Sequence, residues 1–96
     1  MPIRDIAPVH PGEHLSEFLN ELGIDSDRAA ADLRIPASRL DAVIAGAQGI
    51  TADMALRLGR YFGTTPAFWM SLQSKYDLEQ ASDALSDEMD RIARVA

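Results

Sequence analysis

Apolar residues recur along this chain at the spacing of helices and not in the alternation of strands. Between residues 13 and 22, apolar side chains stand at positions 15, 18, 19 and 22, and glutamates stand on the opposite side. This period of 3.6 residues predicts an amphipathic helix with one buried face. The same period returns in later segments, and no segment alternates for long enough to predict a strand. We therefore predict an all-α protein.

Local signals mark where the predicted helices begin and end. The hydroxyl side chains placed to cap a following helix are those of Ser26, Thr51 and Thr65. The glycines that end a helical pattern are Gly23, Gly46 and Gly63. Pro36 interrupts another pattern, because the residue before a proline is disfavoured in the helical region. The predicted helices span residues 13–22, 26–33, 37–45 and 52–62, a fifth segment from 66 onward, and residues 86–95.

Five or six short helices joined by tight turns predict a compact bundle. The 96 residues contain no repeat and no long linker, so we predict one domain over residues 1–96. Within it we expect an N-terminal arm (1–12), a bundle of helices (13–80) and a C-terminal helix (81–96), with a possible hinge at 81–83. The inner face of the first helix is expected to include Leu22.

The segment SDRAAADLRIPASRLDAVIAG at residues 26–46 predicts a helix-turn-helix. Two short helices flank the break at Pro36, and the small Ala29 and Ala30 allow a close, steep crossing. The second helix buries Leu40, Val43 and Ile44, and its outward residues are Ala37, Ser38, Arg39, Asp41, Ala42 and Ala45.

An outer helix end with small and polar residues fits the DNA major groove, which is about 12 Å wide. There Arg39 would pair with guanine, and Ser38 would reach a base or a phosphate. The same pattern also fits a solvated helix in a bundle, because serine and arginine are common surface residues. Both interpretations stay open on this segment alone.

The charge distribution restricts which part of the chain can approach DNA. The net charge is −6, but residues 26–60 carry five arginines and four aspartates, a balance of +1. Only this block suits a phosphate backbone, and its acidic flanks suit a basic protein partner. The candidates for positioning a DNA backbone are Arg28, Arg34 and Gln48. Arg57 and Arg60 could also touch phosphates that flank the groove, but they are more simply interpreted as surface residues.

The aromatic residues near position 70 predict packing and not chemistry. Phe68, Trp69, Leu72 and Tyr76 follow one another at the spacing of a buried helix side, so we assign them to core or dimer packing. His10 and His14 are four apart, but Pro11 and Gly12 lie between them, which argues against a metal site and favours a capping or surface role.

Several classes of function are excluded or disfavoured. The chain has no cysteine, which excludes disulfides and thiolate metal sites. It has no arrangement typical of an enzyme, so we expect no catalytic residues, no cofactor, no metal and no small-molecule substrate. No apolar run approaches the ~20 residues that cross a bilayer, and the start lacks the apolar stretch of a signal peptide. We expect a cytoplasmic protein without membrane contact.

From about Val9 to Glu79 the sequence resembles the HigA-type antitoxins, a branch of the lambda-repressor-like (Xre/Cro-like) helix-turn-helix proteins. The resemblance is carried by HPGEHLSEFLNELGI (10–24), the 26–46 unit, GITADMALRLGRYFGTTPAFWMSLQ (49–73) and YDL (76–78). It implies an Xre-like fold and a homodimer that binds operator DNA and represses its own operon. It further implies neutralisation of a small ribonuclease toxin of the RelE type.

Some positions depart from that family's pattern. Asp27 stands where a glutamine often contacts phosphate, Arg34 where the turn usually has glycine, and Ala45 where asparagine is frequent. Ala47 and Gln48 stand where basic residues are common. Two alternatives therefore remain, a stand-alone Xre-type regulator and a helix-turn-helix-fold protein-binding module with little DNA affinity.

Charge complementarity and the family resemblance together suggest where a basic toxin would bind. We expect the contact on the acidic face of the first helix, with help from the N-terminal arm, and the rival surface is the tail over residues 79–96. The residues of the acidic face are Glu13, Glu17 and Glu21.

Overall fold

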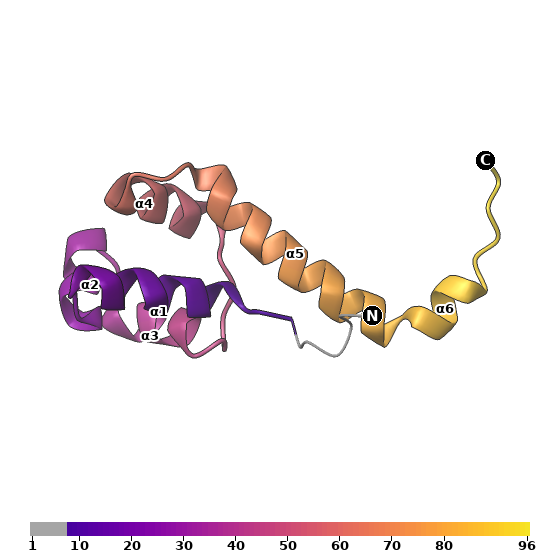
Figure 1. Cartoon of the computed structure of the whole chain (residues 1–96), viewed down its shortest axis with the longest axis horizontal. Coiled ribbons are helices and arrows are strands. Elements are labelled where there is room, and N and C mark those ends of the chain that lie inside the picture. The colour runs from indigo at the N-terminus through magenta and orange to yellow at the C-terminus, as the bar shows by residue number, and fades with distance from the viewer. Residues whose placement is uncertain (1–7) are drawn as a thin grey trace.

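A computed structural model describes residues 8–96 as a bundle of helices without strands (Figure 1). Residues 1–7, most of the predicted arm, lie outside the described part. The all-α prediction is confirmed, and each predicted helix has a counterpart. The helices are α1 (Pro11–Leu22), α2 (Ser26–Leu33), α3 (Ala37–Ile44), α4 (Ala52–Phe62), α5 (Pro66–Ala84) and α6 (Ser86–Asp90).

Capping side chains set the helix starts, and one start and one capping residue differ from the prediction. α1 begins at Pro11 and not at residue 13, because Nδ1 of His10 accepts the amide N–H of Gly12 at 2.9 Å. Pro11 and Gly12 are therefore buried in the bundle and do not belong to an arm. α2 is capped by Asp25 and not by Ser26, since the Asp25 carboxylate accepts the amide N–H of Arg28 at 2.8 Å.

The C-terminal part differs most from the prediction. α5 runs for 19 residues through the expected hinge at 81–83 and ends at Ala84, with Leu85 as its C-cap. α6 has only five residues, and the predicted helix does not continue to residue 95. Residues 80–96 are all exposed, so the apolar side chains of this segment have no surface to pack on. A short helix without tertiary packing is marginal in water, which explains its early end.

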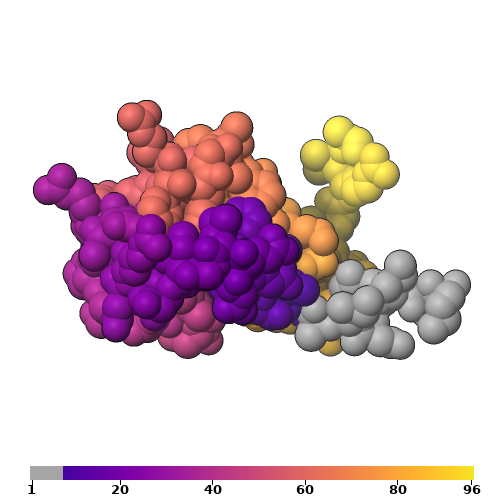
Figure 2. Space-filling view, turned by 60° about the vertical axis from the view of Figure 1, so that its left-hand side comes forward, coloured from indigo at the N-terminus to yellow at the C-terminus, as the bar shows by residue number. Residues whose placement is uncertain are grey.

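The end of α5, α6 and the last residues project from the body of the molecule (Figures 1 and 2). The chain accordingly extends over 49 Å in its longest dimension against 28 and 23 Å in the others. Only the part up to the first half of α5 forms a compact bundle. None of the helices within residues 8–96 has both the length and the apolar character that a membrane span requires.

The core is centred on Trp69 of α5, which is fully buried. Its indole N–H donates to Oγ1 of Thr64 at 2.9 Å, and its ring contacts the rings of Phe18, Phe62 and Phe68. The other fully buried large aliphatic side chains come from α1, α3 and α4 and are Leu15, Leu40, Val43, Met54 and Leu58.

The predicted packing group on α5 divides into a core residue and partly covered residues. Trp69 is in the core, Leu72 and Tyr76 are half-buried, and Phe68 is 37% exposed at the edge. Leu22, expected on the inner face of α1, is instead 60% exposed. α1 ends there, and Ile24 packs against the core after the turn at Gly23.

Gly12 allows the start of α1 to lie directly against the end of α3. A Cβ atom at this position would come within 2.0 Å of the carbonyl oxygen of Val43. This distance is far below a van der Waals contact, and the atom opposite is backbone that cannot rotate away. The position therefore requires glycine for lack of space and not for a special backbone angle.

We predict that Gly12→Ala destabilises the protein by about 1–3 kcal/mol, the usual range for overpacking. The exposed Asn20→Ala on the same helix is the control and should change stability by less than about 0.5 kcal/mol. Urea unfolding followed by circular dichroism measures both. A Gly12→Ala protein as stable as the control would show that α1 and α3 do not meet this closely.

Candidate nucleic-acid interface

The corner between α2 and α3 is made by Arg34 in the left-handed backbone region. Its φ of 62° is the only positive φ at a non-glycine residue within residues 8–96. Two hydrogen bonds close the end of α2 around it, from the amide of Ile35 to the carbonyl of Ala30 and from the amide of Arg34 to the carbonyl of Ala31. Ala29 and Ala30 are buried in α2, which packs against α3 and α4.

The outward face of α3 is the one the sequence predicts. Leu40 and Val43 are buried, and Arg39 and Ala42 are half-buried. The remaining outward residues are exposed, namely Ala37, Ser38, Asp41 and Ala45. The start of α3 has no side-chain cap, because Pro36 occupies the capping position. Most of this face of α3 is therefore small or polar and exposed, and Arg39 and Ala42 are its partly covered residues.

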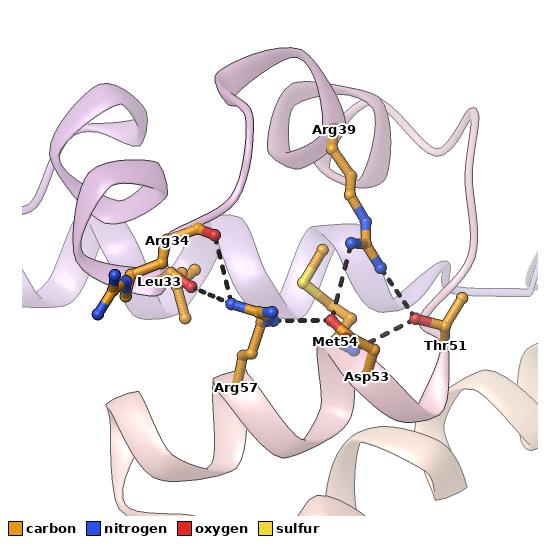
Figure 3. Close-up of polar contacts among 7 residues, drawn as sticks. All are labelled: Leu33, Arg34, Arg39, Thr51, Asp53, Met54 and Arg57. Carbon is orange, nitrogen blue, oxygen red and sulfur yellow. Dashed lines mark hydrogen bonds and ion pairs between the residues drawn. The ribbon is translucent and has the colours of Figure 1, made fainter.

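Arg39 does not point freely away from α3. Its guanidinium extends to the first turn of α4, where Nη2 donates to Oγ1 of Thr51 at 3.1 Å (Figure 3). Nη1 also lies 3.7 Å from Oδ1 of Asp53, and the side chain remains 33% exposed. The predicted base-reading residue is therefore at the surface but held to a neighbouring helix.

Asp53 connects this arginine to a second one. Nε of Arg57 donates to the same Oδ1 at 2.7 Å, and Nη1 of Arg57 donates to the carbonyl oxygens of Leu33 at 2.8 Å and Arg34 at 3.3 Å (Figure 3). Arg57 thus contacts the carbonyl end of α2, where a cation is favourable. The interpretation of Arg57 as a simple surface residue is wrong, because it links α4 to the turn.

The two arginines keep the Asp53 carboxylate ionised. The hydrogen bond from Arg57 lowers the pKa of Asp53 below its usual value, and the charges of Arg57 and Arg39 act in the same direction, while desolvation opposes them. A lowered pKa in the folded state means that this interaction is present above the ordinary carboxyl pKa. It is lost only as the pH falls through the lowered value.

The predicted backbone-contacting residues are all at the surface but in different surroundings. Arg28 is exposed and pairs with Asp32 at 3.5 Å, so a phosphate would compete with that carboxylate. Asp32 also accepts the phenol O–H of Tyr61 at 2.5 Å, and this bond raises the pKa of Tyr61. The side chains of Arg34 and Gln48 are exposed.

The loop that carries Gln48 is fixed to α5 by Gln73. The Gln73 side-chain oxygen accepts the amide N–H of Ile50 at 2.6 Å, and its amide nitrogen donates to Asp77 at 2.9 Å. A Cβ at Gly49 would lie 3.0 Å from the side-chain amide of Gln73, so a larger residue there would require the Gln73 side chain to shift. Gln73 ends the 49–73 segment that carries the family resemblance, but its contact with the loop is seen only in the folded chain.

The other predicted site residues lie outside this face or have structural roles. Glu13, Glu17 and Glu21 form an exposed acidic row on α1 and make no ion pair with another described residue. His10 is the helix cap already described, which confirms its capping role. No group of three metal-binding side chains occurs within residues 8–96.

Two short helices at a tight corner, with a polar outer end on the second, define a helix-turn-helix protein of the Xre type. No protein-family model matches the sequence. Among curated proteins, virulence-associated protein I of Dichelobacter nodosus is 40% identical over 78 residues, which cover 80% of this chain and 72% of that protein. Antitoxin HigA-1 of Vibrio cholerae is 33% identical over 82 residues, covering 84% and 77%.

Solved structures place the chain within one family. A HigA-family addiction module antidote protein from Coxiella burnetii is 40% identical, with a TM-score of 0.90 over 95% of this chain and 100% of that one. The Pseudomonas aeruginosa antitoxin HigA, solved with the higBA promoter, is 42% identical, with a TM-score of 0.86 over 92% and 97%. The chain belongs to the HigA family of antitoxins.

The left-handed backbone at Arg34 leads to a prediction about stability. Left-handed backbone costs an ordinary residue about 1 kcal/mol or more, and glycine tolerates it. We therefore expect Arg34→Gly to raise the free energy of unfolding by about 1 kcal/mol. Arg34→Ala is the matched control, because it removes the same exposed side chain but keeps the Cβ atom. Thermal unfolding measures both variants, and equal stabilities would contradict the assigned backbone strain.

Proposed function

We propose that this protein is an antitoxin-repressor that binds operator DNA as a homodimer through α3. The exposed, small and polar outer face of α3 supports this proposal most directly. The complex of the related Pseudomonas aeruginosa antitoxin with its promoter supports the same mode of action. The repressed operon would be the protein's own, which encodes the toxin as well.

The proposed contacts follow from the geometry of α3. Ser38 and Arg39, near its N-terminal end, read base edges in the major groove. Ala42 lies one turn further on, where its methyl group can contact a thymine methyl. Arg28, Arg34 and Gln48 surround α3 on α2, the turn and the following loop, and they position the DNA backbone.

A homodimer explains how two such helices engage one operator. Two copies of α3 would enter successive major grooves about 34–36 Å apart, one turn of DNA. The outer side of α5 is the proposed contact between copies. It carries the exposed Met70 and Leu78 together with the small Ala67 and Ser74, which allow helices to approach closely.

Neutralisation of the toxin is proposed to use the acidic row on α1. Glu13, Glu17 and Glu21 are exposed at intervals of four residues, so their carboxylates share one side of the helix. A row of exposed carboxylates attracts a basic protein and speeds their association. The proposed partner is accordingly a small basic toxin of the RelE type.

Replacing Arg39 with alanine and replacing Arg28 with alanine should weaken DNA binding in different ways. Arg39→Ala should weaken operator binding by about 1–3 kcal/mol and relax the sequence preference at one position, because a base contact is lost. Arg28→Ala should weaken operator and unrelated DNA alike and reduce the salt slope by about 1, because a phosphate contact is lost. Fluorescence anisotropy with DNA from the chain's own promoter, at several salt concentrations, measures both.

The same titration separates the proposal from its main alternative. A helix-turn-helix-fold module that binds only proteins is favoured by the exposed Asp27 on α2 and by the net charge of −6. If wild-type protein does not prefer its promoter over scrambled DNA, the repressor proposal is wrong. If Arg39→Ala binds the promoter as tightly as wild type, Arg39 is not the reader.

Charge reversal tests the toxin surface. The triple variant Glu13→Lys, Glu17→Lys and Glu21→Lys should lose co-purification with the toxin encoded beside it, because attraction becomes repulsion. The matched control is Asp87→Lys, Glu88→Lys and Asp90→Lys in the exposed tail, which changes the net charge equally. Toxin binding that survives the α1 change and is lost with the tail change would assign the contact to the tail.

A further inference from the structure

The guanidinium of Arg39 on α3 is held in place in the protein without DNA. One of its five N–H groups donates to Thr51, and Asp53 attracts it from the same side. Thr51 is itself fixed, because its hydroxyl oxygen also caps α4 by accepting the amide N–H of Met54 at 3.2 Å. Arg39 therefore keeps N–H groups for an outside acceptor while its orientation is set by α4.

Arg57 connects Asp53 to the turn between α2 and α3. Arg57 bonds to the Asp53 carboxylate and to the carbonyl oxygens of Leu33 and Arg34, so it fixes the carboxylate relative to α2 (Figure 3). A continuous polar chain thus runs from the end of α2 through α4 to the reading side chain of α3. Every distance along it, except the ion pair of Asp53 with Arg39, is that of a hydrogen bond.

We propose that Asp53 is a positioning residue that sets DNA sequence specificity by holding Arg39 toward base edges and away from phosphates. The inference rests on the proposed function, because it requires that Arg39 contacts DNA. It assigns the discrimination between operator and other DNA partly to a residue of α4 that does not itself touch a base.

The physical reason lies in what a free arginine does near DNA. An unconstrained guanidinium reaches any phosphate, and this contact carries no sequence information. A carboxylate beside the guanidinium repels phosphates and offsets its charge. A guanine edge still offers two acceptors in the geometry of the guanidinium fork. Asp53 should therefore reduce binding to all DNA while preserving the base contact.

The test compares Asp53→Asn with Asp27→Asn. Each change removes one negative charge from the first turn of a helix at the DNA-facing region, and Asp27 makes no ion pair within residues 8–96. Asparagine at position 53 keeps an oxygen that accepts the bond from Arg57. Operator and scrambled duplexes are titrated with each variant at several salt concentrations.

For Asp53→Asn we expect binding to scrambled DNA to strengthen and its salt slope to rise by about 1, the effect of one new phosphate contact. The ratio of operator to scrambled affinity should fall about fivefold, the lower end of what one bidentate base contact contributes. For Asp27→Asn both affinities should rise together, with the ratio unchanged.

A third variant separates release of Arg39 from general loosening of the fold. Arg57→Met breaks the link to α2 but leaves the Asp53 carboxylate beside Arg39, so the affinity ratio should fall less than it does for Asp53→Asn. Circular dichroism confirms that each variant is folded at the titration temperature.

The inference is overturned if Asp53→Asn leaves the affinity ratio unchanged, the result expected for Asp27→Asn. It is also overturned if Arg57→Met lowers the ratio as much as Asp53→Asn does. Both outcomes are distinct from failure of the proposed function, in which wild-type protein itself shows no preference for the operator.

Discussion

The close crossing of α2 and α3 is the constraint on which the rest of the molecule depends. It combines the buried Ala29 and Ala30 of α2, a left-handed residue at position 34 and a proline at the N-cap of α3. Because Leu40 and Val43 are buried on one side of α3, the small and polar residues must face outward. The same crossing brings the start of α3 beside the first turn of α4, where Arg39 is held.

Polar contacts, and not only apolar burial, fix this arrangement. Arg57 replaces solvent at the carbonyl end of α2, and Gln73 fixes the loop after α3 to α5. Each contact joins two residues more than twenty positions apart in the sequence, so each restricts the outward face of α3. The cost is a backbone strain at Arg34, which persists because the surrounding bonds determine that position.

The sequence was sufficient to predict the helical fold, the corner at Pro36 and the outward face of α3, because these depend on periodicity and local backbone preferences. It also placed Trp69 among the buried residues. It did not predict that Arg39 is held by Asp53, since that contact joins two helices and depends on their packing. The i to i+4 spacing of Asp53 and Arg57 was a detectable signal. The early end of α6 depends on the absence of a packing surface, which helical periodicity does not report.

Membership of the HigA family and the geometry of α3 lead to the central claim that α3 reads DNA with an arginine fixed by α4. A crystal structure of the protein with its own promoter DNA tests it most directly. We expect α3 in the major groove, with Arg39 facing a guanine edge while still beside Asp53. A structure in which Arg39 has left Asp53 for a phosphate, or in which α3 lies outside the groove, would contradict it.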